Sequence, residues 1–297
     1  MNGSKLKRFL KKNLGGWLIM LPSILLFIFF IWGPLLSNIS LSFFESIGYD
    51  RGAFTGFENY REVFADPVFS KAFFNTLKYT FWSLLLGFGI PIILALLLSE
   101  LVHAKGFFRS AIYFPNIIPG LATILLWTFL FDPSQGGVLN AILDIFNLGP
   151  FPWLNDPDLA IPLIVLTMTW KGAGATTLIY LASLQNVSDV YYEAARIDGA
   201  SLWQRIRHVT LPHLIPTVKT LFILQIIMVF QVFYEPLVMT DGGPNNASIS
   251  LLQLIYRYAF QQGNAAKAAA LGVLVALMLF ALTFAYLKIT NRGKKTS

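Results

Sequence analysis

The sequence lacks cysteine altogether and carries very little charge. Only 12% of its 297 residues are charged, whereas 56% are hydrophobic and 15% are aromatic, and the mean hydropathy is +0.63. Soluble globular domains have about 25% charged residues, so this composition excludes an ordinary soluble domain. The absence of cysteine excludes disulfides, thiolate metal sites and cysteine nucleophiles. The three histidines are too scattered along the chain to indicate a metal-ligand set.

The chain instead contains six charge-poor apolar blocks, each near the ~20 residues that cross a hydrocarbon layer of about 30 Å. The expected spans are residues 17–39, 79–99, 110–131, about 159–184, 220–239 and 268–287. The first block exceeds the ~7–15-residue core of a secretory signal, so we interpret it as a retained helix. Kinks are expected at the prolines in or beside these blocks, namely Pro91, Pro115, Pro119 and Pro162. The predicted fold class is an all-α polytopic membrane protein with six transmembrane helices.

The distribution of positive charge predicts an orientation. The net charge is +7, and fifteen of the 22 lysines and arginines lie in the N-terminal tail, the loops after the second and fourth spans, and the C-terminal tail. An excess of lysine and arginine marks the cytoplasmic side, so both termini are expected in the cytoplasm. Because the excess is spread over four segments, it favours a topology signal, and we expect a bilayer and no nucleic acid as partner.

The spans divide the chain into segments of different character. The expected order is a cytoplasmic basic tail (1–16), the first transmembrane helix (17–39), an external loop (40–74), a core of five transmembrane helices (75–290) that includes a cytoplasmic loop at 188–216, and a cytoplasmic tail (291–297). The outward segments 40–74 and 132–158 show few helix-length patterns and are expected to be short ordered loops. Residues 251–260 predict a short amphipathic helix on the outer surface.

The loop between the fourth and fifth spans predicts two short helical pieces around a glycine. Residues 193–198 favour a helix with an acidic residue near its start, and Gly199 permits a turn. The following residues place Leu202, Ile206 and Val209 at helical spacing. Amphipathicity alone leaves two interpretations open, a helix resting on the bilayer surface or a helix docked on a protein partner.

The residues of this loop also match a known motif. Glu193-Ala194-Ala195, three residues, Gly199, nine residues, Val209, one residue and Leu211-Pro212 resembles the EAA motif of permease subunits of binding-protein-dependent ABC importers, with Val209 where isoleucine is usual. The resemblance implies a type I ABC importer permease fold and a coupling helix that inserts into a groove of an ATP-binding subunit. The residues implied at that contact are Glu193, Ala194, Ala195, Asp198, Gly199, Ala200, Trp203, Leu211 and Pro212.

Further segments resemble the carbohydrate-uptake branch of this family, nearest in pattern to its glycerol-phosphate and disaccharide permeases. They are residues 74–76, 113–115, 181–185, 197–201 and 240–244. The resemblance implies translocation of a sugar, oligosaccharide or polyol phosphate across a bacterial or archaeal cell membrane. It also implies a second permease, with a heterodimer favoured, two ATP-binding subunits and an extracytoplasmic solute-binding protein. The alternatives are a permease of this type for a non-sugar solute and, further away, an ion-coupled carrier or channel.

The sequence lacks the motifs of an enzyme. There is no G-x-x-x-x-G-K-[ST] phosphate loop, no serine elbow and no H-E-x-x-H zinc helix. We therefore expect no catalytic residue, metal or cofactor in this chain. ATP and Mg²⁺ are expected to bind to the partner ATPase subunits.

Polar residues inside two spans predict a substrate pathway, because a charge within a membrane span usually faces a cavity or a partner. Thr167, Lys171 and Gly174 share one face of the fourth span. On the fifth span, a helical stripe is expected to contain Gln225, Met228, Gln231 and Glu235. The candidate pathway residues are Thr167, Lys171, Gln225, Gln231 and Glu235. The alternative is that Lys171 and Glu235 neutralise each other and only fix helix packing.

Overall fold

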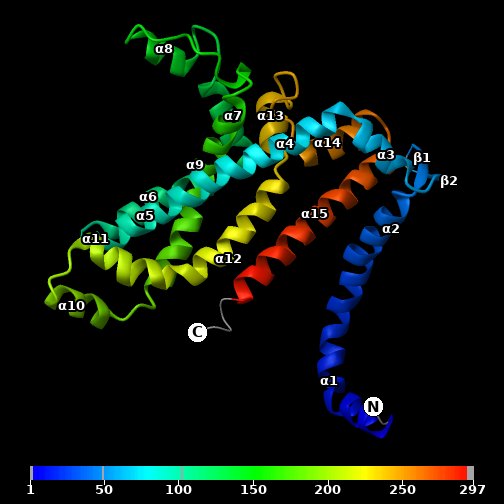
Figure 1. The fold of residues 1–297 in the computed structure, drawn as a ribbon, viewed down its shortest axis with the longest axis horizontal. Coiled ribbons are helices and arrows are strands. Elements are labelled where there is room, and N and C mark those ends of the chain that lie inside the picture. The colour runs from blue at the N-terminus through cyan, green and yellow to red at the C-terminus, as the bar shows by residue number, and fades with distance from the viewer. Residues whose placement is uncertain (1–2, 49, 102, 293–297) are drawn as a thin grey trace. The chain divides into compact units, whose positions relative to one another are not determined.

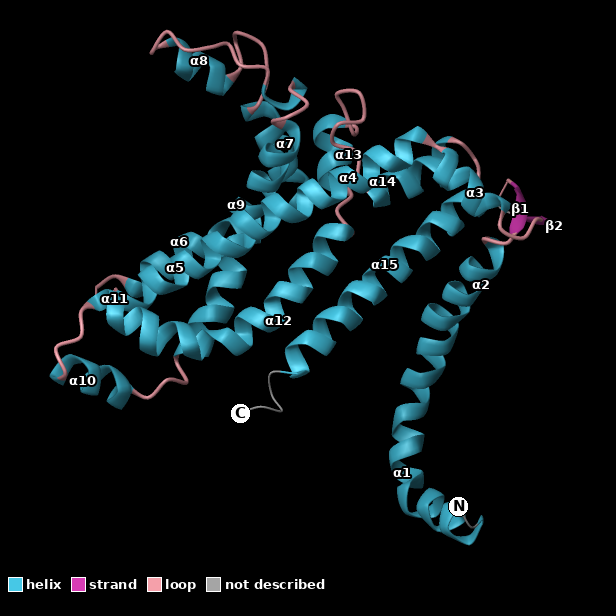
Figure 2. Cartoon of the chain, viewed as in Figure 1, coloured by secondary structure: helices cyan, strands magenta, loops and turns pink. Residues whose placement is uncertain are grey.

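The computed structural model describes residues 3–48, 50–101 and 103–292, which are mostly helical with one β-hairpin (Figures 1 and 2). Its internal contacts divide the chain into two compact units. The first comprises residues 1–63 and 257–274, and the second comprises residues 64–256 and 275–297.

The first unit begins with a long apolar helix. α1 (Gly3–Phe27), a π-helical turn (Ile28–Trp32) and α2 (Gly33–Leu41) follow one another without a gap. Within Gly15–Leu41, the most apolar window buries none of its residues inside the protein. A helix that is apolar all round and unburied within its own chain is suited to contact lipid or another subunit.

A β-hairpin and a short helix follow where only a loop is expected from the sequence. β1 (Phe44–Ile47) pairs antiparallel with β2 (Asp50–Phe54), and α3 spans Glu58–Ala65. The buried Asn59 amide joins these elements, since its Nδ2 donates to the carbonyl of Ser42 at 2.9 Å and to that of Phe44 at 2.8 Å. The expectation that residues 40–74 form one short loop is therefore wrong.

The chain returns to the first unit at residue 257, and this part is also helical. A π-helical turn (Arg257–Gln261) directly follows α14 (Leu251–Tyr256), which belongs to the second unit. α15 (Ala265–Arg292) begins in the first unit and continues into the second. Residues 251–261 thus confirm the helix predicted at 251–260, although three of its apolar side chains are buried in the protein. These are Leu251, Leu254 and Tyr258.

The second unit contains most of the helices. α4 (Pro67–Trp82) continues through a π-helical turn (Ser83–Phe88) into α5 (Gly89–Glu100). The other helices are α6 (Lys105–Ile117), α7 (Gly120–Leu130), α8 (Val138–Asp144), α9 (Ala160–Leu184), α10 (Asp189–Ile197), α11 (Leu202–Arg205), α12 (Leu211–Phe230) and α13 (Tyr234–Thr240), with a 3-10 turn at Trp153–Asn155 and a π-helical turn at Ile206–Thr210.

α9 lies at the centre of the second unit. It contacts α4, α5, α6, α7, α12 and α13 (Figure 1). One apolar cluster, which includes Ile164 and Val165, forms around its first half, and another, which includes Tyr180 and Leu184, forms around its second half. α9 therefore has buried residues in both halves, so its environment is protein on several faces.

Four helical stretches of the described residues are long and apolar enough to cross a membrane. They are Gly15–Leu41, Pro67–Glu100, Leu202–Phe230 and Ala265–Thr290. α6 and α7 add a fifth if they are counted as one span, but they meet at an angle of 92°. The expected third span is thus broken at residues 118–119, at one of the predicted prolines. α9, the expected fourth span, falls outside this set because Lys171 and its threonines and glycines lower its hydropathy.

Two sequence segments far apart in the chain meet along the second half of α4. The buried Asn75 donates from Nδ2 to the carbonyl of Asn246 at 2.8 Å and to that of Ile249 at 3.1 Å. Tyr79 donates from its hydroxyl to the carbonyl of Ser248 at 2.8 Å. These bonds satisfy backbone groups of the loop between α13 and α14, which has no ladder of its own. The loop is therefore held against the side of α4.

One buried amide orders the segment between α7 and α9. The side-chain Nδ2 of Asn140 donates to the carbonyls of Pro133, Ser134 and Phe151, each at 3.1 Å. Its Oδ1 accepts the backbone N–H of Phe151 at 3.0 Å and the indole N–H of Trp153 at 2.8 Å. The prediction of an ordered loop is confirmed here, with α8 as an addition.

Close packing of α6 on α9 predicts a strong effect at one glycine. A Cβ at Gly174 would overlap the carbonyl of Ile112 and lie 2.8 Å from Cα of Tyr113, whereas a Cβ at Gly172 would meet nothing within 4 Å. Overpacking costs about 1–3 kcal/mol, so Gly174→Ala should lower the thermal unfolding midpoint of the purified protein. The matched control Gly172→Ala should leave the midpoint unchanged or raise it, since alanine is more favourable than glycine inside a helix by ~1 kcal/mol. Equal midpoints for both variants would contradict this packing.

Candidate functional site

The segment at residues 188–216, here called the coupling segment, folds into a short helix, a tight turn and the start of a long helix (Figure 1). α10 (Asp189–Ile197) follows Ser188, whose Oγ accepts the backbone N–H of Val190 at 3.4 Å. A serine at this position is a typical helix N-cap. The helix predicted at 193–198 is confirmed, and it begins about one turn earlier.

α10 ends in a Schellman motif. The backbone N–H of Gly199 donates to the carbonyl of Arg196 at 3.1 Å, and that of Ala200 donates to the carbonyl of Ala195 at 2.9 Å. Gly199 has a φ of 73°, in the left-handed region that favours glycine. The alanine and the glycine of the sequence motif therefore occupy the two positions that define the end of this helix.

The second helical piece starts with a capping box. Ser201 Oγ accepts the backbone N–H of Gln204 at 3.4 Å, and Gln204 Oε1 accepts the backbone N–H of Ser201 at 2.7 Å. From there α11, the π-helical turn and α12 form one helical stretch, Leu202–Phe230. The sequence predicts a short second piece, but this piece is the first part of a membrane-length helix. Leu211 and Pro212 lie inside that helix.

α10 is attached to the start of the long helix Leu202–Phe230 by a hydroxyl contact, and this helix is attached to α9 by a second hydroxyl contact and a small core. The Tyr192 hydroxyl lies 3.2 Å from Oγ1 of Thr210, and Ser183 Oγ of α9 lies 2.8 Å from Oγ1 of Thr217. Tyr192 and Val209 also pack against the apolar cluster at the second half of α9. A displacement of α10 would therefore act directly on α9 and α12.

The outer face of the coupling segment exposes apolar side chains. Ile197 is 86% exposed, Val190 66% and Trp203 65%. Of the expected contact residues, Glu193, Ala194, Asp198, Gly199, Trp203 and Pro212 are exposed, and Ala195, Ala200 and Leu211 are half-buried. A concentration of exposed apolar side chains on a rigidly capped turn is typical of a docking surface.

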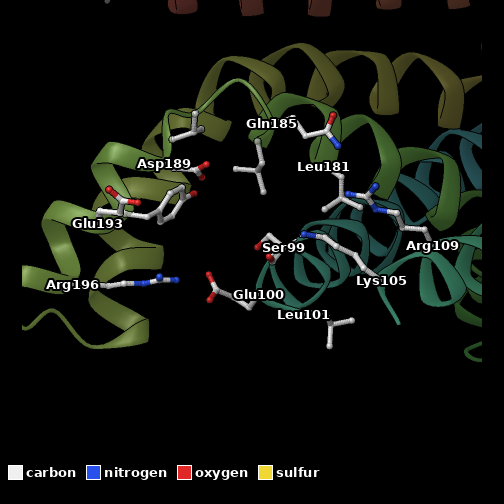
Figure 3. Close-up of a pocket in the computed structure, with 13 residues that line it drawn as sticks. Ser99, Glu100, Leu101, Lys105, Arg109, Leu181, Gln185, Asp189, Glu193 and Arg196 are labelled. Atoms are coloured by element: carbon white, nitrogen blue, oxygen red, sulfur yellow. Dashed lines mark hydrogen bonds between the residues drawn. The ribbon is translucent and has the colours of Figure 1, made fainter. Parts of the chain in front are cut away.

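A charged cavity of about 530 Å³ lies between α10 and the turn that joins α5 to α6 (Figure 3). Its charged lining residues are Glu100, Lys105, Arg109, Asp189, Glu193 and Arg196. Lys105 Nζ donates to the carbonyl of Ser99 at 3.3 Å, which fixes the turn. Glu100 belongs to no sequence motif, and its only signal in the sequence is that it is the acidic residue directly after the second apolar block.

The candidate pathway residues on α9 have backbone partners. Lys171 donates from Nζ to the carbonyl of Ile118, at the break between α6 and α7. Thr167 is buried, and its Oγ1 donates to the carbonyl of Leu163 at 3.1 Å. Among the described residues, Lys171 and Glu235 do not lie within ion-pair distance. Lys171 thus supplies the donor that a broken helix needs at its C-terminal end.

The expected polar stripe on the fifth span is interrupted. α12 ends at Phe230, and residues 231–233 are not helical. Gln225 and Glu235 therefore lie on different helices, and the prediction that they share one helix is wrong. Gln225 donates from Nε2 to Oγ of Ser83, whereas Gln231 is exposed and Glu235 is half-buried in the first turn of α13. No group of three or more metal-ligating side chains occurs in the described residues.

Comparison with known proteins identifies the family. The family described as "Binding-protein-dependent transport system inner membrane component" matches residues 87–294, and the chain belongs to this family. It is thus a multi-pass membrane component, a permease subunit, of an ABC transporter. A permease subunit is not an enzyme, because ATP hydrolysis is carried out by a separate ATPase subunit.

Individual relatives cover almost the whole chain. The lactose transport system permease protein LacF of Rhizobium radiobacter is 33% identical over 286 residues, which cover 95% of each protein. The probable ABC transporter permease protein YurN of Bacillus subtilis is 32% identical over 284 residues, which cover 94% of this chain and 97% of that protein. A chain in the crystal structure of a bacterial alginate ABC transporter, in complex with an alginate pentasaccharide-bound periplasmic protein, superposes with a TM-score of 0.85 at 27% identity, covering 97% of this chain and 98% of that one.

Proposed function

We propose that this permease imports a carbohydrate, and that the coupling segment docks on an ATP-binding subunit that drives the import. The observation that carries the coupling role is the exposed apolar surface of Val190, Ile197 and Trp203 on a helix end fixed by a Schellman motif and a capping box. ATP-driven closure of the partner subunits then moves α10, and α12 moves with it. Alternating access needs no catalytic group in this chain.

The proposed complex contains several partners. A second permease, two ATP-binding subunits that hold ATP and Mg²⁺, and an extracytoplasmic solute-binding protein would complete the importer. The structural relative was crystallised with a saccharide-bound periplasmic protein, which supports the last of these partners.

The proposed topology has six spans with both termini in the cytoplasm of a bacterial or archaeal cell. The four apolar stretches, the bent pair α6–α7, and α9 make up the six. α9 can cross despite Lys171 because protein helices, not lipid, surround much of it. The charge excess on the loops after the second and fourth spans supports this orientation.

The coupling role predicts a graded series at Gly199. Valine is strained at a φ of 73° by about 1–2 kcal/mol, whereas asparagine adopts this region more readily. Gly199→Val should reduce the ATP-binding subunit that co-purifies with the tagged permease about tenfold, and Gly199→Asn should retain most of it. A Cβ at this position meets nothing within 4 Å, so the effect would not come from a clash. Equal recovery from both variants would contradict the role of this turn.

The carbohydrate class predicts the specificity of the whole importer. Relatives named for lactose and alginate transport support a sugar or oligosaccharide substrate, although the solute-binding protein would supply most of the selectivity. Radiolabelled disaccharides and oligosaccharides should enter proteoliposomes that hold the complete complex, in an ATP-dependent manner. Uptake of amino acids or polyamines in place of all sugars tested would refute the substrate class while leaving the permease role intact.

A role for α9 in the pathway predicts an effect at Lys171. Lys171→Met removes the donor to the Ile118 carbonyl at the break between α6 and α7, where the pathway would bend. Sugar uptake should fall about tenfold while the amount of assembled complex, measured by size-exclusion chromatography, stays unchanged. Lys219→Met, which removes an exposed lysine on α12, is the matched control and should transport normally. Normal uptake by Lys171→Met would refute the pathway role.

A further inference from the structure

An ion pair joins the end of α5 to the base of the coupling segment. Glu100 is the last residue of α5, and its Oε2 lies 3.7 Å from Nη2 of Arg205 in α11. The Arg205 side chain is only 15% exposed and that of Glu100 32% exposed. Charges that are partly shielded from water interact more strongly than surface charges.

Arg205 depends on this carboxylate. Its Nε is buried and has no hydrogen-bond partner among the described residues. Glu100 is the acidic residue within ion-pair distance of its guanidinium. Because a buried cation without a counter-charge is costly, the pair holds the end of α5 against the start of the long helix Leu202–Phe230.

A second arginine faces the same carboxylate from α10. Arg196 and Glu100 both line the charged cavity, and Figure 3 shows their side chains pointing toward one another across it. No ion pair joins Arg196 and Glu100 in the described conformation. The turn at Gly199 connects α10 to α11, so a movement of α10 toward α5 would shorten the distance between Arg196 and Glu100.

We propose that Glu100 is a positioning residue for coupling, whose carboxylate pairs with Arg205 in the present conformation and with Arg196 when α10 moves toward α5. The pair with Arg196, absent in one conformation and present in the other, gives the coupling segment two discrete arrangements, which is the property that a transmission element needs. This inference rests on the proposed function, because the ATP-binding subunit supplies the force on α10. It adds a residue from outside the coupling segment to the transmission of that force.

The test uses the complete complex in proteoliposomes and measures the number of sugar molecules imported per ATP hydrolysed. Glu100→Gln removes the charge but keeps the side-chain volume and an oxygen that can accept a hydrogen bond from Arg205, so the complex should assemble and bind the loaded binding protein with an unchanged KM. The import-to-hydrolysis ratio should fall about five- to tenfold, the usual size of a coupling effect. Arg196→Gln should lower the ratio to a similar extent without changing the thermal unfolding midpoint.

The double variant Glu100→Gln with Arg196→Gln separates exchange from independent effects. If Glu100 pairs with Arg196 when α10 moves, the double variant should be no worse than Glu100→Gln alone, because Glu100→Gln already removes the pair with Arg196. Multiplicative losses, or an unchanged ratio in Glu100→Gln, would overturn the proposal. Lys288→Gln, which removes an exposed charge from α15, is the control and should couple normally. Absence of ATP-dependent import in the wild-type complex would instead refute the proposed function.

Discussion

Backbone groups that a broken helix leaves free inside a membrane have to find partners within the protein, and the structure depends on how this chain meets that constraint. At the break after α6, the carbonyl of Ile118 accepts a hydrogen bond from Lys171 of α9. At the break after α12, the carbonyl of Val232 accepts one from Ser250 at 2.6 Å. Side chains from neighbouring elements thus allow two membrane helices to end and bend at fixed points.

Between these fixed points the helices are suited to transmit motion. The long helix of the coupling segment begins at the Ser201 capping box and continues without interruption to Phe230. Its first turns touch α10 through Tyr192 and Thr210, and its far end meets the break that Ser250 stabilises. A push on the exposed face of α10 therefore acts on a stiff lever whose far end lies beside the candidate pathway.

The sequence predicted those parts of the fold that have local causes. The left-handed turn at Gly199 could be predicted because glycine, which has no Cβ, adopts a positive φ without strain. The long apolar helices could be predicted because the thickness of the bilayer sets the length of a span. The start of α4 was also readable, because Asp66-Pro67 is a capping signal, but the prediction placed the span twelve residues later. The end of α12 carries no glycine or proline, and the partner of Lys171 is a carbonyl 53 residues away. Such long-range hydrogen bonds have no signature in one sequence.

If the outer face of α10 contacts an ATP-binding subunit, a photo-crosslinking amino acid at position 197 should capture that subunit. Ile197 is 86% exposed, so the probe should be tolerated without disturbing the fold. After irradiation of intact cell membranes, mass spectrometry of the products should find a covalent adduct with an ATP-binding subunit. An adduct with lipid alone, in membranes that contain the assembled transporter, would contradict this contact.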